Sequence, residues 1–186
     1  IYVSSQYVRE SFLERGFSEE RLALFPLTPD PRFQPLPSRR SSPTFDVLYV
    51  GTLSVVKGVP LLIDALRALP HADMRLMLVG GWKSRAMRRY LERACAADPR
   101  IHACPGDPTP YLRSAAVCVH PSYNDGFAYA PAEALACGLP VIVSEDTGMK
   151  ELIEAGEGDG LVLPTGDLAR LTEAIDAAYR GELFRG

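Results

Sequence analysis

Short apolar runs alternate with helical stretches from residue 45 to the end of the chain, and this alternation constrains the fold more than any other feature. Runs in which neighbouring residues are all apolar are typical of strands that are buried on both faces of a sheet. The predicted strands are Val47–Val50, Arg75–Val79, Ile101–Cys104, Val117–Val119, Val141–Val143 and Leu161–Leu163.

The segments between these runs have the spacing of helices. Leu62, Leu66 and Leu69 give the first of them an apolar stripe at helical spacing. The predicted helices are Gly58–Leu69, Lys83–Ala97, Pro110–Ser114, Ala128–Cys137, Met149–Ala155 and Leu168–Tyr179. Repeated strand–helix units with short turns predict an α/β domain, with a Rossmann-like parallel sheet of about six strands and helices on both faces.

The first 44 residues differ in composition from the rest. Ser4 or Ser5 is expected to cap a short helix that ends near Gly16, and Arg21–Phe25 is expected to form a strand. Six prolines follow between residues 26 and 43, a density that is typical of a linker.

These differences divide the chain into three parts. Residues 1–25 are interpreted as the end of a preceding domain, residues 26–44 as a linker and residues 45–186 as the main domain. Because Ile1 is not a start methionine, we expect the chain to be a fragment or a processed product.

Charge and cysteine usage limit the class of protein. With 20 basic and 23 acidic residues, the net charge of -3 gives no overall field that would attract nucleic acid or a membrane. The four cysteines form no Cys-x-x-Cys pair, which favours reduced thiols over disulfides or a zinc site. No apolar run is long enough to span a bilayer. The predicted location is cytoplasmic, in solution or at the inner face of the membrane.

In open parallel sheets, ligands bind outside the carboxyl ends of the strands. This rule selects the loops that follow the predicted strands, and Lys57 lies in the first of them, just before a helix. Since the helix dipole disfavours a cation there, a bound phosphate would compensate; a solvated lysine is the alternative. The backbone N–H groups of Ala128, Tyr129 and Ala130, at another helix start, would point to the same crevice and help to hold a diphosphate.

Two common nucleotide motifs are absent. Leu53 stands where a dinucleotide-binding Gly-x-Gly-x-x-Gly motif needs its second glycine after Gly51. A P-loop needs Gly-Lys followed by Ser or Thr, whereas the order here is Lys57-Gly58-Val59. A nicotinamide-dependent dehydrogenase and a P-loop nucleotidase are therefore disfavoured.

Two carboxylates follow the fourth predicted strand of the main domain. Asp125 is either a ligand-binding side chain or a turn and helix-capping residue, since Asn-Asp-Gly is a common turn. Glu133, on a helix of small residues, can accept hydrogen bonds from sugar hydroxyls. For His120, at the end of the strand, a structural role is favoured over contact with a ligand.

The segment Asp125-Gly126-Phe127-Ala128, with Glu133 eight positions after Asp125 and then Ala-Leu-Ala-Cys-Gly-Leu-Pro-Val-Ile, carries a family resemblance. It resembles the hallmark of glycosyltransferase family 4, Glu-Gly-Phe-Gly with a second Glu eight positions after the first. Further matches are Gly51-Thr52 with Lys57-Gly58, and Thr147-Gly148 with Glu151. The resemblance covers nearly the whole chain and implies the C-terminal half of a GT-B fold.

The resemblance implies a role for each site residue. Asp125 would contact the donor sugar, Glu133 the ribose, and Lys57 the diphosphate, and these three are the predicted catalytic residues. The loop after Cys104 would face the nucleobase. The predicted donor-contacting set is Gly51, Thr52, Lys57, Asp125, Gly126, Phe127, Ala128, Tyr129, Ala130 and Glu133.

Two residues depart from the family pattern. Thr52 stands where the family has an arginine, and Lys83 or Arg85 is the candidate replacement. Asp125 is one methylene shorter than the family's glutamate, which changes the sugar hydroxyl that it could reach.

The implied activity of the full-length protein is transfer of a hexose from a nucleotide diphosphate sugar, a UDP- or GDP-sugar, to an acceptor hydroxyl with retention of configuration. No metal or other cofactor is implied. A carbohydrate or lipid acceptor, and any membrane contact, would belong to the missing N-terminal domain; no nucleic acid partner is expected. The fragment alone would bind the donor without turnover. The alternatives are another GT-B enzyme, such as an epimerase or phosphorylase, and a non-catalytic sugar-nucleotide-binding domain.

Overall fold

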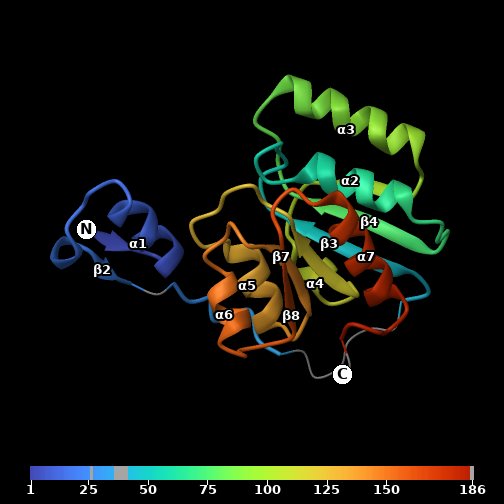
Figure 1. Cartoon of the computed structure of the whole chain (residues 1–186). Coiled ribbons are helices and arrows are strands. Elements are labelled where there is room, and N and C mark those ends of the chain that lie inside the picture. The colour runs from blue at the N-terminus through green and yellow to red at the C-terminus, as the bar shows by residue number, and fades with distance from the viewer. Residues whose placement is uncertain (26, 36–41, 185–186) are drawn as a thin grey trace.

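The computed structural model describes residues 1–25, 27–35 and 42–184. Its centre is a six-stranded sheet in which every neighbouring pair of strands is parallel, in the order β5-β4-β3-β6-β7-β8 (Figure 1). The strands are β3 (Phe45–Val50), β4 (Met74–Val79), β5 (Ile101–Cys104), β6 (Val117–His120), β7 (Val141–Ser144) and β8 (Gly160–Leu163). The predicted α/β class and six-stranded parallel sheet are confirmed.

Helices cover both faces of this sheet (Figure 1). One apolar core joins the sheet to α2 (Val59–Ala68), α3 (Arg85–Ala97) and α7 (Leu168–Tyr179). A second core, on the other face, joins it to α4 (Thr109–Leu112), α5 (Tyr129–Ala136) and α6 (Lys150–Glu154). Successive side chains of a strand point to opposite faces of the sheet. Because helices cover both faces, a strand here needs apolar residues at consecutive positions, and these continuous apolar runs were the basis of the prediction.

The strand order creates a crevice between β3 and β6. After β3 the chain moves outward through β4 and β5, then returns to lay β6 on the other side of β3. At such a switch point the loops after the two central strands diverge and leave room for a ligand. Gly58 allows the two loops to approach, because a Cβ atom there would lie 1.9 Å from the carbonyl oxygen of Pro121.

The N-terminal residues form a small unit beside the main sheet (Figure 1). Its strands β1 (Tyr2–Val3) and β2 (Ala23–Leu24) pair in parallel, and α1 (Gln6–Leu13) lies between them in the chain. Ser5 caps α1 by accepting the N–H of Val8 at 3.1 Å, as expected for one of the two serines. The predicted strand Arg21–Phe25 is too long, since Glu19–Arg21 forms a 3₁₀ turn (η1) and only two residues pair with β1.

This N-terminal unit is attached to the main domain through hydrogen bonds. The backbone N–H groups of Gln6 and Tyr7 donate to the Glu151 carboxylate, at 3.1 and 2.9 Å, and so use the open donors of the first turn of α1. The Ser5 hydroxyl donates to the carbonyl oxygen of Gly126 at 2.6 Å. The chain end that was interpreted as part of a preceding domain therefore contacts the loop after β6.

The division into residues 1–25, 26–44 and 45–186 stays a prediction. The main sheet begins at Phe45, close to the predicted boundary. Residue 26 and residues 36–41 of the predicted linker lie outside the described part of the chain. Within the described part, no helix has the length and apolar character needed to cross a bilayer.

Candidate functional site

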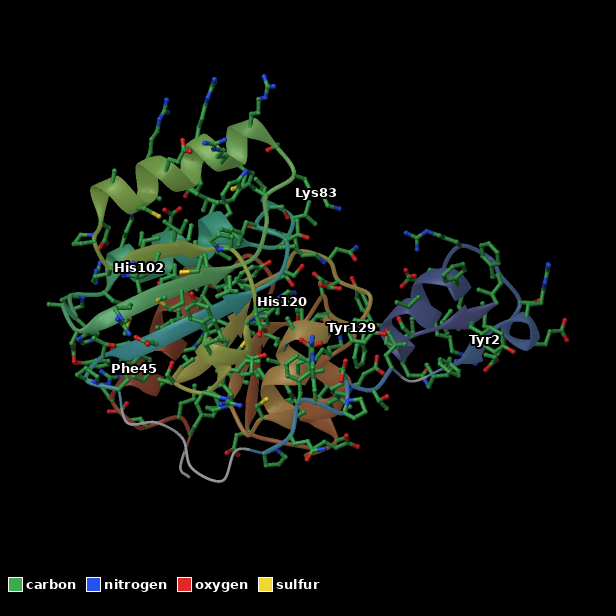
Figure 2. All side chains as sticks on the ribbon, turned by 180° about the vertical axis from the view of Figure 1, so that it is seen from behind. Tyr2, Phe45, Lys83, His102, His120 and Tyr129 are labelled. Carbon is green, nitrogen blue, oxygen red and sulfur yellow. The ribbon has the colours of Figure 1, made fainter. Side chains whose placement is uncertain are left out.

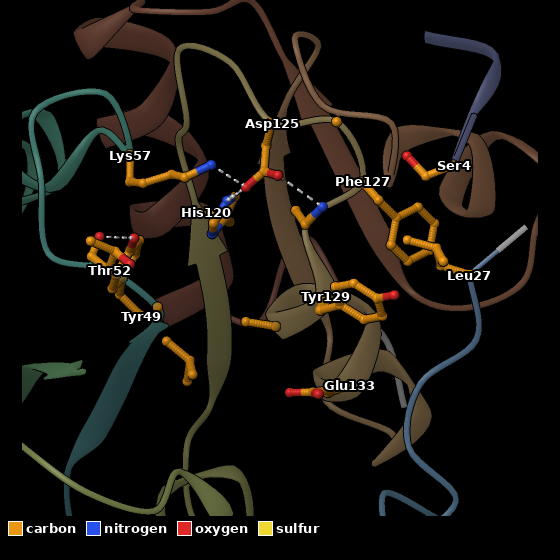
Figure 3. A pocket seen from close by; sticks show the side chains of 15 residues that line it. Ser4, Leu27, Tyr49, Thr52, Lys57, His120, Asp125, Phe127, Tyr129 and Glu133 are labelled. Carbon is orange, nitrogen blue, oxygen red and sulfur yellow. Dashed lines mark hydrogen bonds and ion pairs between the residues drawn. The ribbon is translucent and has the colours of Figure 1, made fainter. Parts of the chain in front are cut away.

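A cavity of about 420 Å³ opens at the carboxyl ends of β3 and β6 (Figure 3). All ten residues that were predicted to contact the donor line it: Gly51, Thr52, Lys57, Asp125, Gly126, Phe127, Ala128, Tyr129, Ala130 and Glu133. Five further residues complete the lining: Ser4, Leu27, Tyr49, Val50 and His120. Of these, only His120 was weighed from the sequence as a possible ligand contact. Ser4 and Leu27 come from the segments that precede the main domain.

Lys57 and Asp125 form an ion pair across the crevice. The Nζ atom of Lys57 lies 2.6 Å from Oδ2 of Asp125 and also donates to the backbone carbonyl of Asn124 at 3.2 Å. A bound phosphate was expected as the partner that compensates this lysine. In the structure the compensating anion is a carboxylate of the protein itself, and the alternative of a freely solvated lysine is wrong.

Asp125 receives two further hydrogen bonds. The Nε2–H of His120 donates to Oδ2 at 3.1 Å, and the backbone N–H of Ala128 donates to Oδ1 at 3.1 Å. Burial by itself would raise the pKa of Asp125, but the hydrogen bonds and charges of His120 and Lys57 outweigh it and lower the pKa to about 2. Asp125 is therefore ionised at neutral pH. Its contact with Ala128 supports the predicted turn role, whereas the predicted helix-cap position is occupied by Ala128 and not by Asp125.

Ala128, the N-cap residue that precedes α5, has an unusual conformation. Its φ of 66° lies in the left-handed region, where a Cβ atom is strained. Its N–H is used by Asp125, so the predicted set of three free N–H donors is wrong for this residue. Tyr129 and Ala130 are in the first turn of α5, where the helix supplies no carbonyl partner for the N–H groups. These two donors remain for an anion.

His120 is held from the side of β3. It is only 4% exposed, and its ring stacks on Tyr49 with the centroids 5.6 Å apart and an angle of 3° between the planes. The Tyr49 hydroxyl donates to the carbonyl oxygen of Thr52 at 3.0 Å. The structural role that was favoured for His120 is confirmed, and the side chain also reaches a residue of the cavity.

Glu133 differs from Asp125 in its surroundings. It projects from α5 toward the cavity, and no hydrogen bond joins it to another lining residue in Figure 3. Burial raises the pKa of Glu133, with the nearby positive charge of Arg32 acting in the opposite direction. Its acceptor oxygens therefore face a space large enough for part of a ligand.

Neither candidate replacement for the family arginine lies in this cavity. Thr52 lines the cavity, but neither Lys83 nor Arg85 does; Lys83 lines a separate groove beside α3 (Figure 2). Among the described lining residues, Lys57 is the one lysine or arginine. The described part of the lining therefore has one lysine and no arginine, where the resemblance implies a pair of basic residues.

Several known proteins are similar in sequence to this chain. The O-antigen chain mannosyltransferase B of Escherichia coli is 31% identical over 147 residues, which cover 74% of this chain and 38% of that protein. A GDP-mannose-dependent alpha-(1-6)-phosphatidylinositol dimannoside mannosyltransferase of Mycobacterium tuberculosis is 36% identical over 122 residues, which cover 60% and 30%. The chain thus spans well under half the length of these relatives.

Solved structures share the fold. The crystal structure of Anabaena HepE in complex with UDP-glucose superposes with a TM-score of 0.82 at 22% identity, over 97% of this chain and 54% of that one. This similarity shows the Rossmann-like architecture of a GT-B domain. The family model described as glycosyl transferases group 1 matches residues 44–180, almost the whole main domain. The chain therefore belongs to the glycosyl transferases group 1 family.

Proposed function

We propose that this chain is the donor-binding half of a retaining glycosyltransferase that takes a hexose from a nucleotide diphosphate sugar. The observation that carries the proposal is the convergence of Lys57, Glu133 and the first turn of α5 on one cavity at the switch point of the sheet. An ammonium group, a free carboxylate and open N–H groups are complementary to a diphosphate and to the hydroxyls of a sugar nucleotide.

Each group has a defined part in this proposal. Lys57 and the N–H groups of Tyr129 and Ala130 bind the diphosphate and stabilise the negative charge that develops on it as the sugar leaves. The Glu133 carboxylate accepts hydrogen bonds from the ribose hydroxyls. Charge stabilisation of the leaving group would then come from protein groups, and we expect the reaction to be independent of metal.

The donor is expected to be a UDP- or GDP-sugar. The Mycobacterium relative is named as GDP-mannose-dependent, and the Anabaena neighbour was crystallised with UDP-glucose. The acceptor, a carbohydrate or a lipid, would bind to the part of the protein that this chain does not span. We expect the reaction to take place in the cytoplasm or at the inner face of the membrane, and this chain alone to bind the donor without turning it over.

Calorimetric titration of the chain with UDP, GDP and ADP tests the proposal. We expect saturable binding of UDP or GDP, weakened about tenfold or more by Lys57→Ala and by Glu133→Ala, because each change removes a charged hydrogen-bonding group. Lys83→Ala, which removes a lysine outside the cavity, is the matched control and should leave the affinity unchanged. Equal binding by wild type and both cavity variants would contradict the proposed site.

A non-catalytic sugar-nucleotide-binding domain is the second candidate. It is favoured by the presence of only one basic side chain, Lys57, among the lysines and arginines of the described lining. The full-length protein separates the two candidates. A glycosyltransferase would hydrolyse or transfer the sugar of the nucleotide that the chain binds, and Glu133→Ala would reduce that rate. A binding domain would have no rate to lose.

A further inference from the structure

We propose that Asp125 is a positioning residue, which holds Lys57 and His120 in place for the donor diphosphate and does not itself bind the donor sugar. This inference rests on the proposed function, because it concerns the same cavity. It gives the first acidic residue of the motif a role that differs from the one the family resemblance implies.

The hydrogen bonds of Asp125 carry the argument. Its Oδ2 atom accepts from Lys57 at 2.6 Å and from His120 at 3.1 Å, and its Oδ1 atom accepts from the backbone of Ala128 at 3.1 Å (Figure 3). A carboxylate has about four acceptor positions, so three of them are filled by the protein. Binding a sugar hydroxyl in place of Lys57 would exchange a charge-assisted bond for a weaker neutral one.

The three donors are held by rigid parts of the fold. His120 ends β6 and stacks on the buried Tyr49 of β3, and Ala128 is the N-cap residue of α5. Lys57 is tied a second time, through the carbonyl of Asn124. Asp125 is thus the point at which the loop after β3, the end of β6 and the start of α5 are joined.

The length of the side chain fits this role. Relative to the glutamate of the family motif, an aspartate draws the carboxylate back toward the loop, where His120 and Lys57 reach it. Only 19% of the Asp125 side chain is exposed. Glu133, on the opposite side of the cavity, keeps the longer side chain, and no hydrogen bond or ion pair joins it to another lining residue drawn in Figure 3. The two carboxylates of the motif therefore have different tasks, one internal to the protein and one directed to the ligand.

The test compares a nucleotide with its own sugar derivative. UDP with UDP-glucose, and GDP with GDP-mannose, are titrated into the wild-type chain, Asp125→Asn and His120→Gln. If Asp125 acts on the diphosphate through Lys57, each change alters the affinity for the nucleotide and for the nucleotide sugar by the same factor. Both affinities then change, while their ratio stays constant within about twofold. Affinities that are the same as in the wild-type chain would contradict the positioning role.

A direct contact with the sugar gives a different result. Loss of a hydrogen bond between the sugar and a charged group would lower the affinity for the nucleotide sugar about tenfold or more and leave that for the free nucleotide unchanged. A fall of this size in the ratio for Asp125→Asn would overturn the inference while the proposed function stood. Failure of the wild-type chain to bind any of the four ligands would overturn both.

Two controls complete the experiment. Asp64→Asn, the same change on the exposed part of α2, should leave all four affinities unchanged.

The unfolding midpoints of Asp125→Asn, Lys57→Met and the double variant test the pair without any ligand. We expect the double variant to lose less than the sum of the two single losses, because both remove one interaction. Additive losses would contradict the pairing on which the inference depends.

Discussion

Asp125 and Glu133 lie eight residues apart in one motif and line the same cavity, yet their surroundings are opposite. Three protein donors contact Asp125, and two of them, His120 and Lys57, lower its pKa, whereas burial without such donors raises the pKa of Glu133. The difference shows that a pair of acidic residues with the right spacing does not define one shared function. The donors that the tertiary structure brings to each carboxylate decide what it does.

The largest effect that would sharpen this comparison is on stability. Asp125→Ala should lower the free energy of unfolding by about 2 kcal/mol at pH 7, because a pKa lowered from 3.8 to about 2 corresponds to stabilisation of that size. Since the folded pKa is the lower one, the contribution is present above pH 3.8 and is lost as the pH falls through about 2. Urea unfolding of both proteins between pH 7 and pH 2 measures it.

The control for this prediction is Asp64→Ala, on the exposed side of α2, which should change stability by less than about 0.5 kcal/mol. A loss in Asp125→Ala that is no larger than in the control would show that the contacts of Asp125 do not stabilise the fold.

The second effect is on ligand binding. In contrast to the change at Asp125, a change at Glu133 should weaken binding without lowering stability. Glu133→Gln should weaken binding of UDP or GDP about tenfold, because an acceptor with full charge is replaced by a neutral amide. Its stability at pH 7 should equal or exceed that of wild type. The pKa of Glu133 is raised in the folded state, so its ionisation costs stability as the pH rises from 4.5 through the folded value.

Calorimetry and thermal unfolding of Glu133→Gln at pH 5 and pH 8 test both parts. Glu154→Gln, on the exposed end of α6, is the matched control and should leave binding and its pH dependence unchanged. A variant that unfolds more easily but binds as well as wild type would reverse the assignment of the two carboxylates.

The smallest effect concerns Ala128, which lies between the two carboxylates in the motif. Ala128→Gly should raise the free energy of unfolding by about 1 kcal/mol, because a glycine adopts φ near 66° without strain. The same change at Ala96, in the last turns of α3, should instead lower it by up to about 1 kcal/mol. Chemical denaturation of both variants gives the comparison, and a loss of stability in Ala128→Gly would show that the conformation is not strained.

Much of the fold could be predicted because its signals are local. The strand Ile101–Cys104 and the helix Leu168–Tyr179 have the predicted bounds, and the other strands of the main sheet differ by one or two residues at an end. Apolar runs and helical spacing are properties of neighbouring residues. The short strand β2 was predicted too long because two paired residues leave almost no pattern to read.

Most of the residues that line the cavity could be predicted, but the hydrogen bonds and ion pairs between them could not. All ten predicted residues line it. The rule that ligands bind at the carboxyl ends of parallel strands selected the loops, and the family resemblance implied the residues within them. Ser4 and Leu27 were missed because nothing in their local sequence indicates that the N-terminal unit contacts the loop after β6.

The sequence by itself determined the parallel sheet, the edge at which the site lies and the types of side chain present there, because each follows from short-range patterns. Only the tertiary structure decided that Lys57 pairs with Asp125, 68 positions away, and that His120 joins them. The physical reason is the strand order, in which β3 and β6 are neighbours in the sheet although β4 and β5 separate them in the chain. Side chains from the loops after these strands meet only because the chain returns to the middle of the sheet, and the energy of an ion pair depends on the final distance between its atoms.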